Sequence, residues 1–212
     1  MEEILIFGSS GHAKVVIDAV EKQGTYRIAG LVDSGKGRGE QVLGYPVLGG
    51  EPQLPAILRT VPVVGGIVAV GDNWSRAEQV QRILALVPEF KFISVIHPSS
   101  QIAHGVIIGE GTVVLAGAIL NTDTQVGRHC IISTKASLDH DGFVGDYSFV
   151  APGATTGGNV RLGDFSVLAL GAGAIHGIRI GEHTVVGAGS MVLDDLPSCV
   201  VAYGVPARVR RN

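Results

Sequence analysis

The second half of the chain repeats an aliphatic residue every six positions. From residue 102 to residue 192 this position holds Ile, Leu or Val at every repeat except Thr156 and Ala174. The aliphatic series is Ile102, Ile108, Val114, Leu120, Val126, Ile132, Leu138, Val144, Val150, Thr156, Leu162, Leu168, Ala174, Ile180, Val186 and Val192. No insertion interrupts it. Because a single hexad cannot bury its apolar side alone, this strict period predicts a stack of coils.

Two other positions of the hexad are restricted in size. Four residues after the aliphatic position the side chain is small or valine at nearly every repeat, as in Ala118 and Ala136. The residue directly after the aliphatic one is often glycine, as in Gly109 and Gly145. We expect the aliphatic side chains to fill the interior, the small ones to fit at corners, and the glycines to relieve backbone strain where the chain turns. A β-sandwich would instead show a period of two broken by irregular turns.

The residues before the repeat alternate short apolar runs with amphipathic segments. Strands are expected at 3–7, 28–32, 66–70 and 90–96. The helix after the first strand should stop at Gly24, and the helix after the third should begin at a capping box of Ser75 and Glu78. Strands that alternate with helices predict a parallel sheet.

A glycine-rich loop joins the first strand to the first helix. The loop Gly8-Ser9-Ser10-Gly11 can present N–H groups to an anion at the positive end of the helix. The third glycine of a dinucleotide fingerprint is missing, so the loop alone is weak evidence for a phosphate site and fits better a tight turn that packs a helix on a strand. Asp33 ends the second strand, where an acid commonly binds a ribose or base. Together, the loop and Asp33 favour a nucleotide site.

Composition narrows the class of protein. The chain has 212 residues, of which 46% are hydrophobic and 17% charged, so it can form a sizeable core. A net charge of −3 argues against a nucleic-acid partner. We see no signal peptide and no membrane span, and Cys130 and Cys199 form no disulfide framework or zinc pattern. We therefore expect a cytoplasmic protein with reduced cysteines and no membrane contact.

The hexads resemble those of the left-handed parallel β-helix family. The whole chain, with Gly8-Ser-Ser-Gly-His12, Gly71-Asp-Asn73, His97-Pro-Ser99 and a tail Gly204-Val-Pro-Ala-Arg208, is similar to bacterial nucleotide-sugar acetyltransferases. These include the UDP-bacillosamine and perosamine N-acetyltransferases and the sialic acid O-acetyltransferases grouped with them. The resemblance implies a small α/β, Rossmann-like domain over 1–97 that binds a nucleotide sugar. It also implies a left-handed β-helix of hexapeptide repeats over 98–212, which ends in a C-terminal tail.

The resemblance also implies a site. In Leu138-Asp-His-Asp-Gly142, His140 would be the general base and Asp141 would raise its basicity. The residues implied to bind the nucleotide sugar are Ser10, Gly11, His12, Asp33 and Gly71, and those implied to lie along acetyl-CoA are Gly158, Leu170, Ala188 and Pro206. The family members are usually homotrimers with active sites at subunit interfaces, and no metal is expected.

Two positions depart from the family pattern. Ser133 stands where Asn is common and keeps a hydrogen-bonding group, whereas Phe149 stands where a His that contacts the thioester region is common. The second change removes a polar group, so polarisation of the acetyl carbonyl would have to come from elsewhere, such as a backbone N–H.

The hexad register separates the histidines. His104, His140 and His176 share one column two coils apart, but only His140 is bracketed by acids, Asp139 and Asp141. A neighbouring carboxylate favours the imidazolium and fixes the tautomer, as a base requires. We expect His104 and His176 on a solvated face. His129 and His183 share another column, expected at the surface.

The resemblance implies acetyl-CoA-dependent N-acetylation of a nucleotide-linked amino sugar, of the UDP-4-amino-sugar type. Transfer would be direct, because acetyl-CoA is already activated and Cys130 falls at a small interior position. An O-acetyltransferase that acts on sialic-acid-type or other surface-polysaccharide sugars is the alternative. A β-helix that is not an acyltransferase, such as a zinc carbonic-anhydrase-like protein, fits less well with the acids beside His140 and the Gly-Val-Pro-Ala-Arg tail. The nucleotide, the sugar and the pathway stay open.

Overall fold

A computed structural model describes residues 1–211. Contacts divide the chain into two compact units, Met1–Pro98 and a second unit from Ser99 onward. No helix in residues 1–211 is long and apolar enough to cross a membrane.

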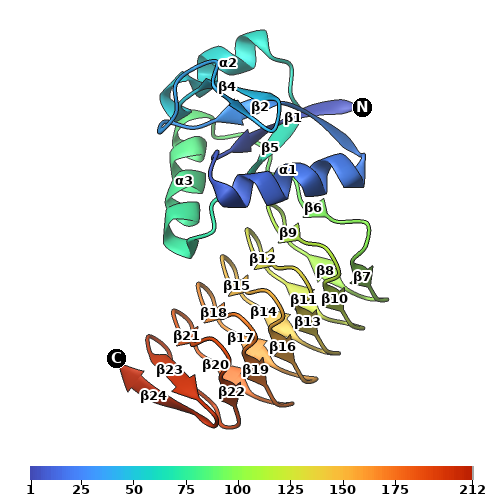
Figure 1. Ribbon diagram of the computed structural model, residues 1–212, viewed down its shortest axis with the longest axis vertical. Helices are drawn as coiled ribbons and strands as arrows, with labels where there is room; N and C mark the ends of the chain where they lie inside the picture. The colour runs from blue at the N-terminus through green and yellow to red at the C-terminus, as the bar shows by residue number, and fades with distance from the viewer. Residues whose placement is uncertain (212) are drawn as a thin grey trace. The chain divides into compact units, whose positions relative to one another are not determined.

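The first unit is built on a mostly parallel sheet with the strand order β3-β4-β2-β1-β5 (Figure 1). Its strands are β1 Glu2–Phe7, β2 Tyr26–Val32, β3 Gln41–Val42, β4 Tyr45–Gly49 and β5 Gly65–Val68. Only β3 runs antiparallel to its neighbour. The parallel sheet expected from the alternation of strands and helices is confirmed, and β3 and β4 were not predicted.

Two expectations about this unit were wrong. The strand expected at 90–96 is reduced to β6, Val95–Ile96, and one bridge between Gly66 and Phe92. Phe90 packs edge-on against Phe7, with ring centroids 5.3 Å apart, and Gly66 exchanges backbone hydrogen bonds with Lys91 and Ile93, so aromatic contacts and this bridge anchor the segment together. The second expectation concerned the start of a helix at Ser75. Asp72 caps that helix instead and accepts from the Ser75 N–H, because Asp is as good an N-cap as Ser.

The helices of this unit are α1 Gly11–Gln23, α2 Leu54–Thr60, which follows the short 3₁₀ turn η1 Glu51–Gln53, and α3 Asn73–Leu86. Helix α1 buries Ala13, Val16, Ile17 and Val20, as the pattern predicts. It ends at Gly24, which takes the left-handed conformation with φ 67°. The predicted stop of α1 is therefore confirmed. The pattern predicted neither η1 nor α2.

The second unit is a left-handed parallel β-helix with three two-residue strands per coil, as the family resemblance implies (Figure 1). Leu120 pairs with Leu138, so one coil takes three hexads. The first face holds β7 Gln101–Ile102, β10 Ile119–Leu120, β13 Ser137–Leu138, β16 Thr155–Thr156, β19 Gly173–Ala174 and β22 Met191–Val192. The second face holds β8 Ile107–Ile108, β11 Gln125–Val126, β14 Phe143–Val144, β17 Arg161–Leu162 and β20 Arg179–Ile180.

The third face of the prism carries the C-terminal end. It holds β9 Val113–Val114, β12 Ile131–Ile132, β15 Phe149–Val150, β18 Val167–Leu168 and β21 Val185–Val186, followed by the hairpin β23 Val201–Gly204 and β24 Ala207–Arg211. The aliphatic positions fill the prism, and Leu120, Ile132 and Val150 are fully buried. The small positions Ala118 and Ala136 are fully buried as well. Both expectations about the interior are confirmed.

The glycines that directly follow the aliphatic position have a different structural role from the one expected. Positive φ occurs three residues after the aliphatic position, as at Gly117 (68°) and Asp141 (55°), and not one residue after it. Gly109 sits at the earlier position, where a Cβ would lie 2.6 Å from the backbone of Gly127 in the next coil. These glycines therefore permit close stacking of coils, and the left-handed residues make the corner.

The expectation that His129 and His183 lie at the surface was wrong for His129, which is only 4% exposed. His129, Tyr147, Phe165 and His183 form a continuous ring stack up one corner. Neighbouring centroids are 5.0, 5.0 and 5.1 Å apart. The coil repeat places planar side chains directly above one another, so each ring covers the next. His104 and His176 are exposed, as predicted.

Candidate active site

The turn between β13 and β14 presents His140 and Asp141. Their side chains meet, with 2.7 Å between His140 Nδ1 and Asp141 Oδ2, and both remain more than half exposed. Asp141 makes this contact from the left-handed corner conformation, which Asp tolerates better than most residues. A carboxylate on Nδ1 holds the proton there and leaves Nε2 with a lone pair. The turn therefore presents a base that faces away from its own carboxylate partner.

Electrostatics in this turn favour the protonated imidazole. The hydrogen bond with Asp141 raises the pKa of His140, and the charges of Asp139 and Asp141 act in the same direction. A raised pKa makes the imidazole a stronger proton acceptor when it is neutral.

Two residues support His140: Asp139, which the sequence marks only as a neighbouring charge, and Asn121, which the local pattern does not indicate. Asp139 Oδ1 accepts two hydrogen bonds, from the His140 N–H at 2.8 Å and from Asn121 Nδ2 at 2.9 Å. These bonds lower the pKa of Asp139, so its carboxylate stays ionised. Asn121 lies one coil before Asp139, so the coil length could have identified the pair. Together they fix the backbone from which the His140 ring projects.

Gly158 lies one coil beyond His140. A Cβ on Gly158 would come within 2.5 Å of His140 Nε2, so the glycine leaves the space that the imidazole occupies. Leu170 and Ala188 occupy a different corner of the prism, one coil apart and both exposed. Pro206 lies between β23 and β24. The structure thus groups Gly158 with the histidine and places the other three residues of the implied acetyl-CoA set elsewhere on the prism.

The two departures from the family pattern lie on the same unit. Ser133 is only 4% exposed, and Phe149 is half-buried in β15. Phe149 offers no side-chain donor.

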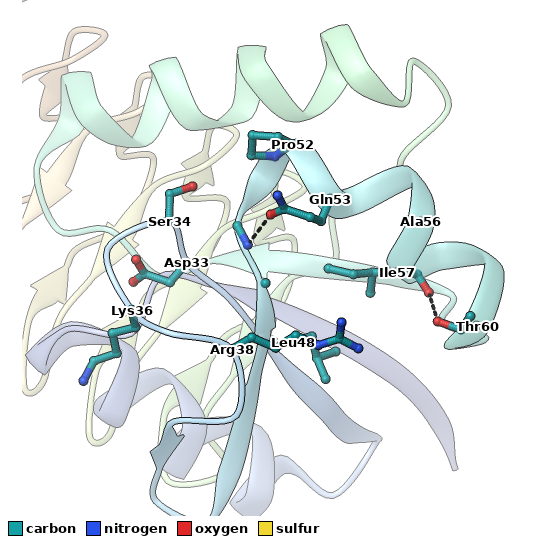
Figure 2. Close-up of a pocket in the computed structure, with 12 residues that line it drawn as sticks. Asp33, Ser34, Lys36, Arg38, Leu48, Pro52, Gln53, Ala56, Ile57 and Thr60 are labelled. Atoms are coloured by element: carbon teal, nitrogen blue, oxygen red, sulfur yellow. Dashed lines mark hydrogen bonds between the residues drawn. The ribbon is translucent and has the colours of Figure 1, made fainter.

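In the first unit, Asp33 lines a cavity of about 740 Å³ (Figure 2). Its carboxylate accepts a hydrogen bond from Ser9 Oγ at 2.6 Å and another from the Gly35 N–H at 2.7 Å. Lys36 and Arg38 line the same cavity, which opens where β2 and β4 end. Ser9 belongs to the glycine-rich loop, but nothing in the local pattern shows that its hydroxyl donates to Asp33.

The other predicted nucleotide residues do not line this cavity. Ser10, Gly11 and His12 follow β1, and Gly71 follows β5, which is the neighbour of β1 in the sheet. His12 Nε2 is buried and has no hydrogen-bond partner within residues 1–211. Burial, together with the charge of Arg76, lowers the pKa of His12 to about 4. His12 is therefore neutral at physiological pH.

Comparisons with known proteins show relatives that contain both units. Residues 3–83 match the PglD N-terminal domain. Over 99% of this chain and 98% of the other, the protein is similar to PerB from Caulobacter crescentus, solved in complex with CoA and GDP-perosamine. Identity is 37% and the TM-score is 0.91. The chain belongs to the hexapeptide-repeat nucleotide-sugar N-acetyltransferase family.

Two further family relatives agree. The acetyltransferase domain of PglB from Neisseria gonorrhoeae, in complex with acetyl coenzyme A, is 31% identical over 99% of each chain, with a TM-score of 0.90. The UDP-N-acetylbacillosamine N-acetyltransferase of Bacillus subtilis is 37% identical over 120 residues, which are 55% of this chain. The match spans about half of that relative, 52% of its length.

No group of three or more His, Cys, Asp or Glu side chains in residues 1–211 is arranged to hold a metal ion.

Proposed function

We propose that this protein transfers the acetyl group of acetyl-CoA to the amino group of a nucleotide-linked amino sugar, with His140 as general base. The observation that carries this proposal is the 2.7 Å contact between His140 Nδ1 and Asp141 Oδ2 on the outer turn of a coil. It supplies a base that is both oriented and exposed to a substrate. Membership of the nucleotide-sugar N-acetyltransferase family indicates acetyl transfer to an amine as the reaction that this base would serve.

Acetyl transfer needs a neutral amine and a place for one proton. As the amine attacks the thioester carbonyl carbon, His140 Nε2 takes the proton that the nitrogen loses. Asp141 stabilises the imidazolium that forms. The carbon–sulfur bond then breaks, the sulfur leaves with its electron pair, and the imidazolium can return the proton to it.

Direct transfer is consistent with the surroundings of Cys130. Its thiol is only 1% exposed and donates to the Gly145 carbonyl, with 3.0 Å between Sγ and the oxygen. A thiol enclosed in this way cannot reach an acetyl group on the surface of the prism. In this proposal the amine of the sugar is the nucleophile.

The first unit holds the nucleotide in this proposal. Asp33 accepts hydrogen bonds from a ribose or a base, and the cavity at its side chain has room for one of them. Ser10, Gly11, His12 and Gly71 receive the phosphates, near the positive end of α1. The cations Lys36 and Arg38 in the cavity wall add charge that favours an anionic substrate.

In this proposal the acetyl-CoA groove follows Gly158, Leu170, Ala188 and Pro206, and the enzyme is a homotrimer whose active sites lie between neighbouring prisms. Exposed apolar side chains on the coils support such packing, among them Ile107 at 60% and Leu170 at 59%. In the same proposal the working compartment is the cytoplasm, and the product serves surface-polysaccharide or glycan synthesis.

The test is a panel of UDP-, GDP- and dTDP-linked 4-amino sugars with acetyl-CoA, in which release of free thiol is followed. Each amino sugar is matched by the same nucleotide sugar with a hydroxyl at that carbon. We expect thiol release with at least one amino sugar and none with its hydroxyl partner. Turnover of hydroxyl or sialic-acid-type acceptors alone would replace the proposal by O-acetylation.

A further inference from the structure

Arg76 is the largest fully buried side chain of the protein, with 1% of its surface exposed. It lies on α3, and its guanidinium reaches back to the loop between β5 and α3. Nη1 donates to the carbonyl oxygens of Val70 at 3.0 Å and Gly71 at 2.9 Å, and Nη2 donates to Asn73 Oδ1 at 2.8 Å. Burial of a cation is costly, and these bonds offset part of the cost. The arrangement fixes the path of this loop.

The consequence is a definite direction for two N–H groups. In a trans peptide the C=O and the following N–H point in opposite directions, and the one cis bond within residues 1–211 is Val205–Pro206. Because the carbonyls of Val70 and Gly71 point at Arg76, the N–H groups of Gly71 and Asp72 point away from it. Neither N–H donates a hydrogen bond to another group within residues 1–211. A Cβ built on Gly71 would meet no atom within 4 Å, so the space beside it is open.

The loop lies at the position where a sheet of this kind binds its ligand. Strand β1 has β2 on one side and β5 on the other, so the direction of winding changes between β1 and β5. In open parallel sheets, ligands bind beyond the carboxyl ends of the strands at such a switch point. The loops after β1 and β5 are tied together there by the Ala69 N–H, which donates to the Phe7 carbonyl at 2.7 Å.

We propose that Arg76 is a positioning residue for the diphosphate of the sugar nucleotide. It holds the two peptide groups so that the N–H groups of Gly71 and Asp72 face the phosphate oxygens. This inference rests on the proposed function and adds to it a residue that acts without touching the substrate.

Electrostatics at this edge of the sheet agree with that role. Asp72 lies in the same loop, and hydrogen bonds from Ser75 lower the pKa of its carboxyl, with a smaller contribution from the charge of Arg76. The Asp72 carboxylate is therefore held by the N-terminus of α3 through Ser75. His12 is neutral, so positive potential at the switch point comes from Arg76 and from the N-terminus of α1.

The experiment compares Arg76→Met, Arg76→Lys and the wild type. Arg27→Met is the matched control, because Arg27 is an exposed cation at the other end of β2, beside Glu3. For each protein we would measure kcat, the KM for the sugar nucleotide, the Kd for CoA, the Kd for UDP and GDP by calorimetry, and the melting temperature. Loss of hydrogen bonds to a charged group costs roughly tenfold to a hundredfold in affinity. We expect KM and the nucleotide Kd of Arg76→Met to rise by about that factor, with kcat and CoA affinity nearly unchanged.

Lysine keeps the charge but lacks the planar fork, so Arg76→Lys should lie between the wild type and Arg76→Met. If Arg76→Met does not fold, Arg76→Lys decides by the same criterion. A folded Arg76 variant with wild-type KM and nucleotide Kd would overturn the inference. So would equal losses in kcat, CoA affinity and nucleotide affinity, since these indicate general loosening. If the wild type acetylates none of the amino sugars, the proposed function fails, and the nucleotide Kd values still decide the role of Arg76.

Discussion

The two units of this protein place functional side chains by different means. In the β-helix, residues one coil apart lie next to each other, so the neighbours of His140 are Gly158 and, through Asp139, Asn121. In the α/β unit, contacts such as Ser9 with Asp33 join loops that follow different strands. In the repeat, a fixed spacing in the sequence therefore determines which residues of the site are neighbours. In the parallel sheet, the neighbours come from loops that are far apart in the sequence.

The largest loss of kcat is expected when His140 is replaced, and it should distinguish His140 from the other histidines of its column. His140→Ala should lower kcat by roughly a hundredfold to ten-thousandfold, the usual share of a general base. His176→Ala is the control, because His176 is exposed in the same column but has no acid on either side. It should leave kcat unchanged. Equal activity of the two variants in a thiol-release assay would remove His140 from the mechanism.

Asp141→Asn should lower kcat by about tenfold or more, because the imidazolium loses its carboxylate partner. It should also shift the pH profile. The wild-type base is active when neutral, so activity is lost as pH falls through a His140 pKa that Asp141 has raised. Without that carboxylate the pKa falls, and the acidic limb should move to lower pH. An acidic limb that stays in place would show that Asp141 does not tune the base.

The sequence was sufficient to predict the β-helix, but it predicted only part of the candidate site. The hexads predicted the interior because equivalent positions, such as that of Leu120, have the same environment in every coil. The left-handed corner was placed wrongly, since a glycine such as Gly109 signals either backbone freedom or close approach of chains. The burial of His129 also escaped prediction, because its cover comes from Tyr147 in the next coil.

The α/β unit was harder to predict. Its first strand and helix follow plain hydrophobic patterns, but β3, β4 and α2 lie in a segment rich in glycine and proline that carries no clear period. The sequence pattern did not identify Arg76, because its buried position depends on carbonyls of the preceding loop.

Asp33→Asn tests the nucleotide side of the comparison. The amide keeps the size of the side chain but loses the charge and one acceptor, so KM for the sugar nucleotide should rise about tenfold. CoA affinity should not change. Asp18→Asn is the control, because Asp18 makes only an exposed ion pair with Lys22 on α1. Calorimetry with UDP, GDP and CoA separates the two effects, and a loss of CoA affinity in Asp33→Asn would contradict the assignment.

The smallest effect is expected at Asn121. Asn121→Ala removes one of two hydrogen bonds to Asp139 and leaves the other, to the His140 N–H, in place. We expect kcat to fall by a factor of about two to ten, in line with one net hydrogen bond, and KM to stay constant. Asn121→Asp, which places two carboxylates together, should lower kcat further than Asn121→Ala does. A rise in KM without loss of kcat would show that Asn121 contacts substrate.

A double-mutant cycle tests the division of labour between the units most directly. The kcat/KM for the sugar nucleotide would be measured for wild type, His140→Ala, Asp33→Asn and the double variant. Independent sites give free-energy effects that add to within about 0.5 kcal/mol, so the two fold-losses should multiply. A double variant no worse than His140→Ala alone would show that both residues serve the same step, and the account of a binding unit and a chemical unit would be wrong.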